Sequence, residues 1–537
     1  MKKILIVILI LLICSSFVIS CGSKSSTTTS TPATTTTSSA TTTSSATTTT
    51  TKTTATTTPS VTPKKGGTLN WIFWVSPKTP LGLPWEIFGG ELLAASACYD
   101  GFFNLSSKGV MDPALALSYK VADDLKSITF ELRQGVKFID GTDFNAATAK
   151  WNIDKYIELK KNPYWASAET VGTYTLKVNL NYWVNTALSG FSSLWCISPT
   201  AYATKGEEWA RNNPTGTGPF KFASFQRDAS YKVVKNPNYW RPDLPRLDAI
   251  NTIYVADSNT IRMAIEAGTV DCSQIEAGKT AADLKAKGFN LAVNVNTTMC
   301  MLPDTAHADS IFANEKVRQA VEYAIDREAI AKAFSFGMWE APYQVPSKST
   351  MGFNPNFTLA RKYDQAKAKQ LLTEAGYPTG FTAKLGWPAL SLDKNIALAV
   401  IGDLAKVGII LELDAPPVLP QYFDNTNNAK NELFWQPIFS GANWNGALSM
   451  SMSPTLTNMN LAWARTPEFL ALYDKSLKSK DPDQKLMWDI SNYLTEHALV
   501  IPVMCGSTAY LSATYVMDPG FYSRGADWAP ETIWLNK

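Results

Sequence analysis

The side chains that could carry acid–base or metal chemistry are few and isolated in this chain of 537 residues. Its two histidines, His307 and His497, each lack a second ligand at metal-binding spacing. The adjacent carboxylates Asp123 and Asp124 precede a predicted strand and are typical of a solvated turn. No nucleophile elbow, zinc-protease or phosphate-loop motif occurs. We therefore expect no catalytic site, no metal and no cofactor; a cell-surface hydrolase assembled from distant residues is the alternative.

The seven cysteines are widely spaced and form no C-x-x-C motif. Cys14 falls within a predicted N-terminal signal and Cys21 ends that signal. The five that remain are Cys98, Cys196, Cys272, Cys300 and Cys505. An odd number permits at most two disulfides, and we expect buried free thiols for most of them.

Aromatic side chains, in contrast, are abundant, with 17 Trp, 20 Tyr and 24 Phe. Binding sites for organic solutes use aromatic walls together with a few polar groups that fix the ligand's orientation. The charges nearly cancel, with 49 Lys and Arg against 46 Asp and Glu, so nothing predicts a nucleic-acid or polyanionic partner. The composition therefore favours binding of a small solute over catalysis.

The N-terminus predicts export. A positive start is followed by an unbroken apolar run over residues 4–13, and Ser20 directly precedes Cys21. This pattern is typical of a bacterial lipoprotein signal peptide over residues 1–21, in which the thiol of Cys21 is acylated after cleavage. An uncleaved membrane anchor is the alternative. In both cases we expect the rest of the chain at the cell membrane, facing the extracellular or periplasmic side.

Residues 22–65 are mostly serine and threonine and contain no Leu, Ile, Phe, Trp or Tyr. Such a segment cannot bury enough apolar surface to offset the entropy cost of ordering. We expect a disordered linker between the anchor and the globular part, either O-glycosylated or unmodified.

The globular part from Gly66 onward is too long for one core, so two or three lobes are expected. Apolar and polar residues alternate over 128–132 and 176–180, which predicts strands, and Asn145 can cap a helix between them. Residues 104–210 are therefore predicted to form an α+β unit of their own.

Later in the chain the pattern predicts several helices and a strand–helix–strand unit. The predicted helix starts carry the N-cap residues Asn314, Asp326 and Asp364. The strand–helix–strand unit covers residues 381–387, 395–407 and 409–413. That order favours a parallel arrangement of the two strands with a covered face.

Twelve short motifs follow one another along the chain. They are Gly66–Leu69, Cys98–Phe102, Pro113–Ala116, Thr129–Arg133, Gly135–Phe138, Asp140–Thr142, Gly216–Phe220, Lys235–Trp240, Val317–Ala320, Ala324–Arg327, Ala368–Leu372 and Glu374–Pro378. Their order resembles bacterial extracellular solute-binding protein family 5, the oligopeptide-, dipeptide- and nickel-binding receptors of ABC importers. Each motif is weak alone, but their order from residue 66 to about residue 413 is specific. We attribute the glycines at 216 and 218 to a tight turn that a β-carbon would obstruct.

The resemblance implies an α/β fold of the two-lobed, class II periplasmic-binding-protein type, with mixed sheets and an extra α+β domain. Its segments would be lobe I at 66–103, 211–300 and 505–537, the extra domain at 104–210, and lobe II at 301–504. It also implies a receptor that closes over a small-molecule or peptide-like solute and delivers it to an ABC permease and its ATPase. We expect a monomer. A surface sensor or adhesion protein on the same fold is the alternative.

Candidates for the binding site lie where predicted strands run into loops that the resemblance places at the cleft, and each can equally well pack in the core. They are Trp74, Tyr99, Trp387, Trp435, Asn443, Trp444 and Asn445. Gly441 and Gly446 enclose the last three, so we expect that cluster to project from its loop. Trp151 and Trp240 lie inside scaffold motifs and are assigned to packing.

The chain departs from peptide-binding members of the family where those members hold the charges of a peptide. They carry an Asp near this Trp for the amino group and an Arg for the carboxylate, whereas this chain has Asn445 and no arginine between Arg361 and Arg465. Lys394 is the one cation in the matching loop and lacks the two-pronged geometry of Arg. A zwitterionic dipeptide is therefore disfavoured as the solute, and a larger, neutral or aromatic-stacking solute such as an oligosaccharide is favoured. The exception is the case in which an acid from another loop, Asp424, takes the role of the missing Asp.

Overall fold

The computed structural model describes most of the chain from Thr62 onward. The described ranges are 62–74, 76–87, 91–106, 110–295, 297–388, 394–439, 444–456, 460–506, 508–521 and 528–537. The chain divides after residue 61 into two units, and the second contains every described helix and strand. The predicted signal peptide with Cys21, the linker up to residue 61, and Asn443 lie outside the described residues.

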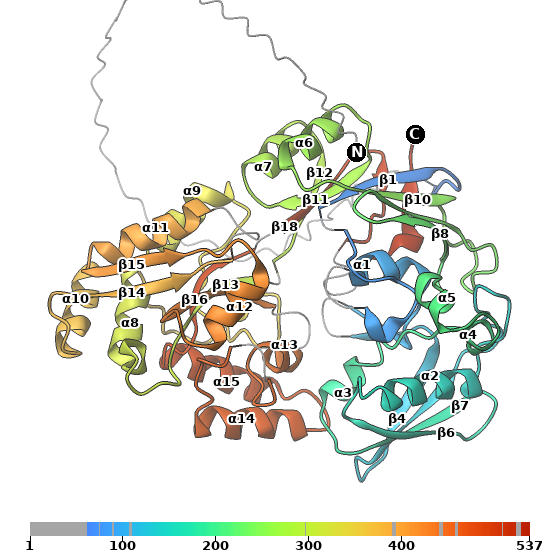
Figure 1. The fold of residues 1–537 in the computed structure, drawn as a ribbon, viewed down its shortest axis with the longest axis horizontal. Helices are drawn as coiled ribbons and strands as arrows, with labels where there is room; N and C mark the ends of the chain where they lie inside the picture. The colour runs from blue at the N-terminus through green and yellow to red at the C-terminus, as the bar shows by residue number, and fades with distance from the viewer. Residues whose placement is uncertain are drawn as a thin grey trace, which may run out of the picture. The chain divides into compact units, whose positions relative to one another are not determined.

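The first lobe is built on a mixed seven-stranded sheet in the order β12-β18-β11-β1-β10-β9-β8 (Figure 1). Its strands are β1 (Thr68–Phe73), β8 (Phe220–Gln226), β9 (Ser230–Lys235), β10 (Ala249–Tyr254), β11 (Cys272–Glu276), β12 (Asn290–Val293) and β18 (Thr508–Ser512). The helices against it are α1 (Glu91–Ala95), α6 (Ser258–Glu266) and α7 (Lys279–Ala286). Since side chains alternate along a strand, Ile72 of β1 packs with α6 and α7, while Trp71 and Phe73 pack with α1.

The extra domain is an antiparallel four-stranded sheet in the order β4-β5-β7-β6, with α2 packed against it. Its elements, with the short ones around it, are β2 (Phe103–Leu105), β3 (Met111–Pro113), β4 (Ala116–Val121), β5 (Ser127–Leu132), α2 (Ala146–Glu158), β6 (Trp165–Thr170), β7 (Thr175–Leu180), α3 (Thr186–Ser189), α4 (Pro199–Lys205) and α5 (Glu207–Asn212). Burial of Ile128, Phe130 and Leu132 confirms the alternation predicted for β5. Asn145 caps α2 as predicted, because its side chain accepts from two backbone N–H groups of the first turn.

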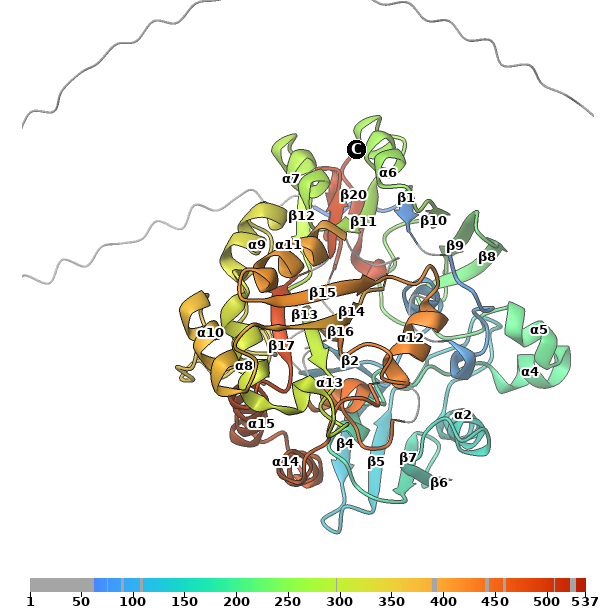
Figure 2. The same cartoon turned by 60° about the vertical axis from the view of Figure 1, so that its left-hand side comes forward.

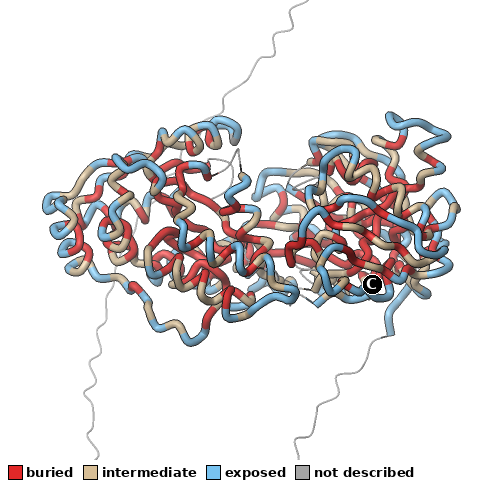
Figure 3. Tube along the Cα trace, turned by 90° about the horizontal axis from the view of Figure 1, so that it is seen from below, coloured by how far each residue is buried: buried red, intermediate tan, exposed pale blue. Residues whose placement is uncertain are grey.

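The second lobe is built on a mixed five-stranded sheet in the order β15-β14-β16-β13-β17. Its strands are β13 (Thr297–Pro303), β14 (Phe381–Gly386), β15 (Ile409–Asp414), β16 (Leu433–Phe439) and β17 (Ile501–Cys505). Its helices are α8 (Glu315–Ala324), α9 (Arg327–Ser335), α10 (Gln365–Glu374), α11 (Lys394–Ala405), α12 (Leu419–Asn427), α13 (Trp444–Ser451), α14 (Pro467–Lys478) and α15 (Gln484–Glu496). Helices α8 to α11 share one core with the sheet and α12 to α15 share another, and buried segments run through the interior of both lobes (Figure 3).

Several predictions for the second lobe are confirmed. Asn314, Asp326 and Asp364 cap α8, α9 and α10 through hydrogen bonds from backbone N–H groups of the first turn. Strands β14 and β15, on either side of α11 in the sequence, are parallel. The local signals for these elements therefore agree with the tertiary structure.

Two antiparallel connections, β12 to β13 and β17 to β18, join the two lobes (Figures 1 and 2). The backbone N–H of Asn294 donates to the carbonyl of Thr508, and that of Gly506 donates to the carbonyl of Thr297, each at 2.8 Å. Gly506 has a φ of 111°, a conformation that favours glycine. A pair of short connections suits a hinge between lobes. The lobe boundary predicted after residue 300 falls inside β13, because this whole strand pairs within the second sheet.

Three of the sequence motifs meet around the buried carboxylate of Asp100. The donors to it are Thr217 Oγ1 at 3.2 Å, Tyr239 OH at 3.0 Å and Trp240 Nε1 at 2.9 Å. A β-carbon on Gly216 or Gly218 would lie 2.3 Å from the backbone of Cys98. These glycines are therefore required for close packing of two segments and not for the tight turn that the sequence predicts. Because these two segments of lobe I precede and follow the extra domain in the sequence, their packing holds the two chain connections to that domain together.

The five cysteines of the described part are all buried free thiols, in agreement with the expectation for most of them. Burial raises the pKa of the Cys98 thiol to about 12, which keeps it neutral. Within the described ranges, no helix combines the length and apolar character needed to cross a bilayer. The same ranges bring no three His, Cys, Asp or Glu side chains into a group that could hold a metal ion.

Candidate functional site

Trp74 follows the central strand of lobe I and is 43% exposed. Strand β1 has parallel neighbours on both sides, and open α/β sheets bind ligands at the carboxyl ends of strands where the chain direction diverges. The Nε1 of Trp74 donates to Oε1 of Gln274 on β11 at 2.9 Å. This hydrogen bond restrains the orientation of the indole while a large part of its surface stays accessible.

Phe439 occupies a related place in lobe II, as the last residue of β16, and is 50% exposed. It pairs in register with Thr297, which accepts the hinge hydrogen bond from Gly506. In lobe I, Gln274 pairs with Tyr510 on β18, the strand that directly follows the second hinge connection in the sequence. Exposed aromatic side chains from both lobes therefore flank the two hinge connections.

Sequence reasoning missed Phe439. The segment 433–439 is apolar almost throughout, so it has no period that separates buried from exposed positions. The available signal is the Ser-Gly pair directly after Phe439, which marks the end of the strand and the place where a side chain can become accessible.

Trp387 follows β14, the strand of lobe II that has parallel neighbours on both sides. Its indole is 1% exposed, and its ring centroid lies 4.6 Å from that of Trp435 on β16. Neither Nε1 has a hydrogen-bond partner within the described residues. The structure thus brings two predicted site residues together, but inside the core that the sheet shares with α8 to α11.

Tyr99 is buried in the core of lobe I. Its ring stacks on that of Trp195, with centroids 5.3 Å apart and planes 6° apart. The hydroxyl donates to the carbonyls of Leu81 and Gly82, at 3.0 Å each. Burial holds the pKa of Tyr99 well above its ordinary value. These contacts give Tyr99 a role in the scaffold.

Trp444 and Asn445 differ from the projecting cluster that the flanking glycines predict. Trp444 begins α13 and is fully buried against Gly352, where an added β-carbon would come within 2.6 Å of the indole. Asn445 is also fully buried; its Nδ2 donates to Asn185 Oδ1 at 3.2 Å, and its Oδ1 accepts from Ser476 Oγ at 3.1 Å. The start of a helix turns both side chains inward, and Asn445 contacts the extra domain.

Two of the charged residues weighed for peptide recognition have partners within the protein, and the third is exposed at a helix start. Asp424 pairs with Lys430 at 2.6 Å. The buried guanidinium of Arg361 pairs with Glu322 at 2.6 Å. Lys394 is exposed at the first position of α11. No arginine–carboxylate pair for the two ends of a peptide is formed by these residues.

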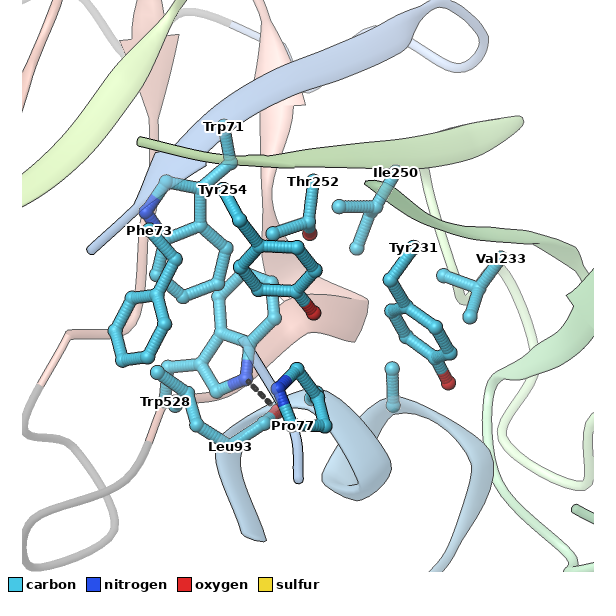
Figure 4. Close-up of a pocket in the computed structure, with 12 residues that line it drawn as sticks. Trp71, Phe73, Pro77, Leu93, Tyr231, Val233, Ile250, Thr252, Tyr254 and Trp528 are labelled. Atoms are coloured by element: carbon cyan, nitrogen blue, oxygen red, sulfur yellow. Dashed lines mark hydrogen bonds between the residues drawn. The ribbon is translucent and has the colours of Figure 1, made fainter. Parts of the chain in front are cut away.

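A small apolar cavity lies in lobe I between the sheet and α1 (Figure 4). Trp71 and Tyr254 line it from the sheet, and Leu93 and Trp528 line it from the other side. The Nε1 of Trp528 donates to the carbonyl of Leu93 at 3.3 Å, which closes that side. The volume of about 20 Å³ matches roughly one water molecule, so this cavity is too small for an organic solute.

Both histidines lie in lobe II beside carboxylates. His307 Nδ1 is 2.9 Å from Asp304, and His497 Nδ1 is 2.7 Å from Glu315. The hydrogen bond with Asp304 raises the pKa of His307. The first pair is local, whereas the second joins the end of α15 to the start of α8. Among the described side chains, neither pair brings a third metal ligand with it.

Comparison with known proteins identifies close parallels to this architecture. The family model described as bacterial extracellular solute-binding proteins, family 5 Middle, matches residues 110–460. The glutathione-binding protein GsiB of Escherichia coli strain K12 is 29% identical over 483 residues, which cover 81% of this chain and 89% of GsiB.

Solved structures of the same architecture superpose on most of the chain. The periplasmic binding protein DppA from Helicobacter pylori, in complex with peptide STSA, has a TM-score of 0.75 at 20% identity and covers 88% of this chain and 99% of its own. NikA from Brucella suis, in complex with Fe(III)-EDTA, has a TM-score of 0.77 at 22% identity and covers 87% of this chain and 100% of its own. The predicted two-lobed α/β fold is thereby confirmed. The chain belongs to family 5 of the bacterial extracellular solute-binding proteins, the receptors that deliver peptides or other solutes to ABC importers.

Proposed function

We propose that the solute contacts Trp74 of lobe I and Phe439 of lobe II when the lobes close over it. The observation that carries this proposal is the exposure of both aromatic side chains at strand ends beside the hinge connections. An indole already held by Gln274 loses little conformational freedom on binding, which favours affinity. The buried Trp387, Trp435 and the other buried candidates support the site from the core and do not touch the solute.

The solute is an organic molecule recognised mainly through an apolar or planar surface, not through paired opposite charges at its two ends. The glutathione-binding relative and the peptide complex of DppA support a peptide-like size. Burial of Arg361 in its pair with Glu322 and the surface pair of Asp424 with Lys430 support recognition without a charge at each end of the solute. An oligosaccharide meets the same description.

The solute that co-purifies with the protein, identified by native mass spectrometry, is the direct test. We expect it to be recovered chemically unchanged after incubation, because the chain acts by binding and not by catalysis. The matched variants are Trp74→Ala and Trp209→Ala, since Trp209 is an exposed tryptophan on α5. Loss of the co-purifying solute in Trp74→Ala and its retention in Trp209→Ala support the proposed site; equal occupancy in both variants refutes it.

Short zwitterionic peptides provide a second test of the solute class. We expect glutathione and the dipeptide Met-Leu to bind with Kd above roughly 100 μM, which limits the binding free energy to about −5.5 kcal/mol. The physical reason is that a charge buried without a partner costs several kcal/mol. Isothermal titration calorimetry measures this directly, and low-micromolar binding of several unrelated dipeptides would return the chain to the peptide-binding members of its family.

We further propose that acylated Cys21 holds the receptor at the outer face of the membrane. The positive start, short apolar run and Ser-Cys cleavage pattern support this. Replacing Cys21→Ala is expected to move the protein from the membrane pellet to the soluble fraction. Continued sedimentation of this variant with membranes would instead favour an uncleaved anchor.

A further inference from the structure

The extra domain meets lobe II at the end of α14 (Figure 1), where a set of hydrogen bonds joins them. The backbone N–H of Asn185 donates to the carbonyl of Leu477 at 2.8 Å, and its Nδ2 donates to the carbonyl of Ser476 at 2.6 Å. The Nε1 of Trp183 donates to the carbonyl of Ser479 at 3.1 Å. All three donors belong to the extra domain and all three acceptors belong to lobe II.

Two of the acceptors, the carbonyls of Ser476 and Leu477, lie in the last turn of a helix, and the third, the carbonyl of Ser479, belongs to the residue that follows the helix. Helix α14 ends at Lys478, so the carbonyls of its last turn have no N–H group of the same helix to accept from. Asn185 supplies donors from another domain to the carbonyls of Leu477 and Ser476, the second of which also accepts from Ser479 Oγ at 2.7 Å. Trp183 supplies a donor to the carbonyl just beyond the helix. The extra domain therefore caps the C-terminal end of α14 in the way that a helix is usually capped by its own chain.

The hydrogen-bonded side chains of this junction are buried and uncharged, and one exposed ion pair, between Lys480 and Asp123 at 3.8 Å, crosses the same contact. Asn445 lies behind Asn185, where its Nδ2 donates to Asn185 Oδ1 and its Oδ1 accepts from Ser476 Oγ. Asn185, Asn445 and Ser476 are all buried. A buried polar group that loses its partner carries a desolvation penalty, so the junction depends on each of its hydrogen bonds.

The packing beside the junction is incomplete. A hollow of about 200 Å³ is lined by Leu105 and Met111 from the extra domain side and by Met351 and Met487 from lobe II, with Asn185 at its edge. The hollow opens to solvent, so the two domains are not packed against each other continuously here, and contacts between domains of one chain are commonly of this kind. The contact thus combines specific hydrogen bonds with incomplete packing.

We propose that Trp183 and Asn185 form a latch that holds lobe II against the extra domain and must be broken for the lobes to open. The extra domain is tied to lobe I by backbone hydrogen bonds, from the N–H of Ile139 to the carbonyl of Gly216 at 2.9 Å and from the N–H of Ser198 to the carbonyl of Thr215 at 3.1 Å, so it moves with lobe I about the hinge. Opening at the hinge connections then separates Asn185 from the end of α14. The latch itself does not depend on the proposed function. Its further consequence, a longer residence of the bound solute, rests on that function.

Hydrogen exchange of the ligand-free, full mature chain carrying Cys21→Ala tests the latch, because the amide of residue 185 is protected only while it donates to Leu477. The variants are Asn185→Ala and Trp183→Phe, which keeps the aromatic packing but removes the donor. Asn181→Ala is the matched control, since the side-chain amide of Asn181 donates to Pro163 and Trp165 in its own domain.

We expect exchange over residues 183–190 to accelerate by about tenfold in Asn185→Ala, which corresponds to a loss of about 1.4 kcal/mol. Trp183→Phe is expected to show a smaller acceleration, and Asn181→Ala none in this segment. Small-angle scattering should show a larger radius of gyration for Asn185→Ala than for the control. Unchanged exchange at 183–190 would overturn the proposal, and so would acceleration throughout β4 to β7, because Asn185 would then only support the fold of its own domain.

The outcome is independent of the solute. If Trp74→Ala abolishes retention of the co-purifying solute while Asn185→Ala leaves exchange unchanged, the receptor function stands and the latch is refuted. If Asn185→Ala accelerates exchange while Trp74→Ala retains the solute, the latch stands and the proposed solute site is refuted.

Discussion

The two lobes place a tryptophan at corresponding positions and use it differently. Trp74 follows β1 and Trp387 follows β14, and each of these strands has parallel neighbours on both sides. Trp74 is exposed and its N–H is bonded to Gln274, whereas Trp387 is buried on Trp435 and its N–H has no partner among the described residues. The same topological position therefore carries an accessible ring in one lobe and a core ring in the other.

The difference comes from what the neighbouring strand offers. In lobe I, β11 places an amide beside the indole, and a hydrogen-bonded tryptophan can keep a polar edge in a wet environment. In lobe II, β16 places a second indole there, and two apolar rings bury each other. In lobe II an accessible aromatic beside the hinge is instead found one strand away, at Phe439.

The largest expected effect that separates the lobes is on stability. Trp387→Ala should lower the free energy of unfolding by about 3–5 kcal/mol, because it leaves a cavity in the core of lobe II. Trp74→Ala should change it by no more than about 0.5 kcal/mol, since an exposed ring is lost. Urea denaturation followed by circular dichroism measures both. A large loss of stability in Trp74→Ala would show that the two tryptophans share a structural role.

For solute affinity we expect the exposed tryptophan to matter more than the buried one, and the changes in free energy to be smaller than those in stability. Trp74→Ala and Phe439→Ala are each expected to raise the Kd for the co-purifying solute by about tenfold, or about 1.4 kcal/mol. Gln274→Ala should have a weaker effect in the same direction, because it frees the indole without removing it. Titration calorimetry of the stripped proteins provides the measurement. An unchanged Kd in Phe439→Ala, with a raised Kd in Trp74→Ala, would confine recognition to lobe I.

The smallest expected effect is a pH dependence confined to lobe II, which holds both histidines. The pKa of His307 is raised in the folded chain by the hydrogen bond to Asp304. Its contribution to stability is therefore fully present below the unfolded pKa of about 6.5 and is lost as pH rises through the higher folded value. The pair is partly exposed, so the loss should not exceed about 0.5 kcal/mol.

Thermal unfolding of the wild-type chain and of His307→Asn between about pH 6 and pH 8.5, a range that spans the titration of histidine, measures this contribution. The wild type should lose slightly more stability than the variant as the pH rises. If instead the variant is the more pH-sensitive protein, the ion pair of His307 is not the source of the dependence.

Local sequence signals predicted much of the scaffold. The N-caps Asn145 and Asn314, the alternating strand over 128–132 and the parallel pair β14 and β15 are all as expected, because each depends on residues close together in the chain. The same signals predicted a tight turn at Gly216, where the structure has close packing against Cys98, since the partner segment lies far away in the sequence.

The candidate site could be predicted only in part. The position after β1 was found because an aromatic residue follows a predicted strand, but Phe439 was missed because its strand has no alternation. Trp444 and Asn445 were expected to project because glycines flank them. Their inward orientation depends on a helix start packed against Gly352 and the extra domain, and no local pattern specifies that packing.

By itself the sequence determined the family, the two-lobed α/β class, the signal pattern and the scarcity of catalytic groups, because these follow from composition and the order of motifs. Only the tertiary structure decided which tryptophans are accessible, that β13 belongs to the second sheet, and that Asn445 contacts Asn185. Exposure and contact across domains depend on residues separated by hundreds of positions, and periodicity within one segment cannot specify which distant segment covers it.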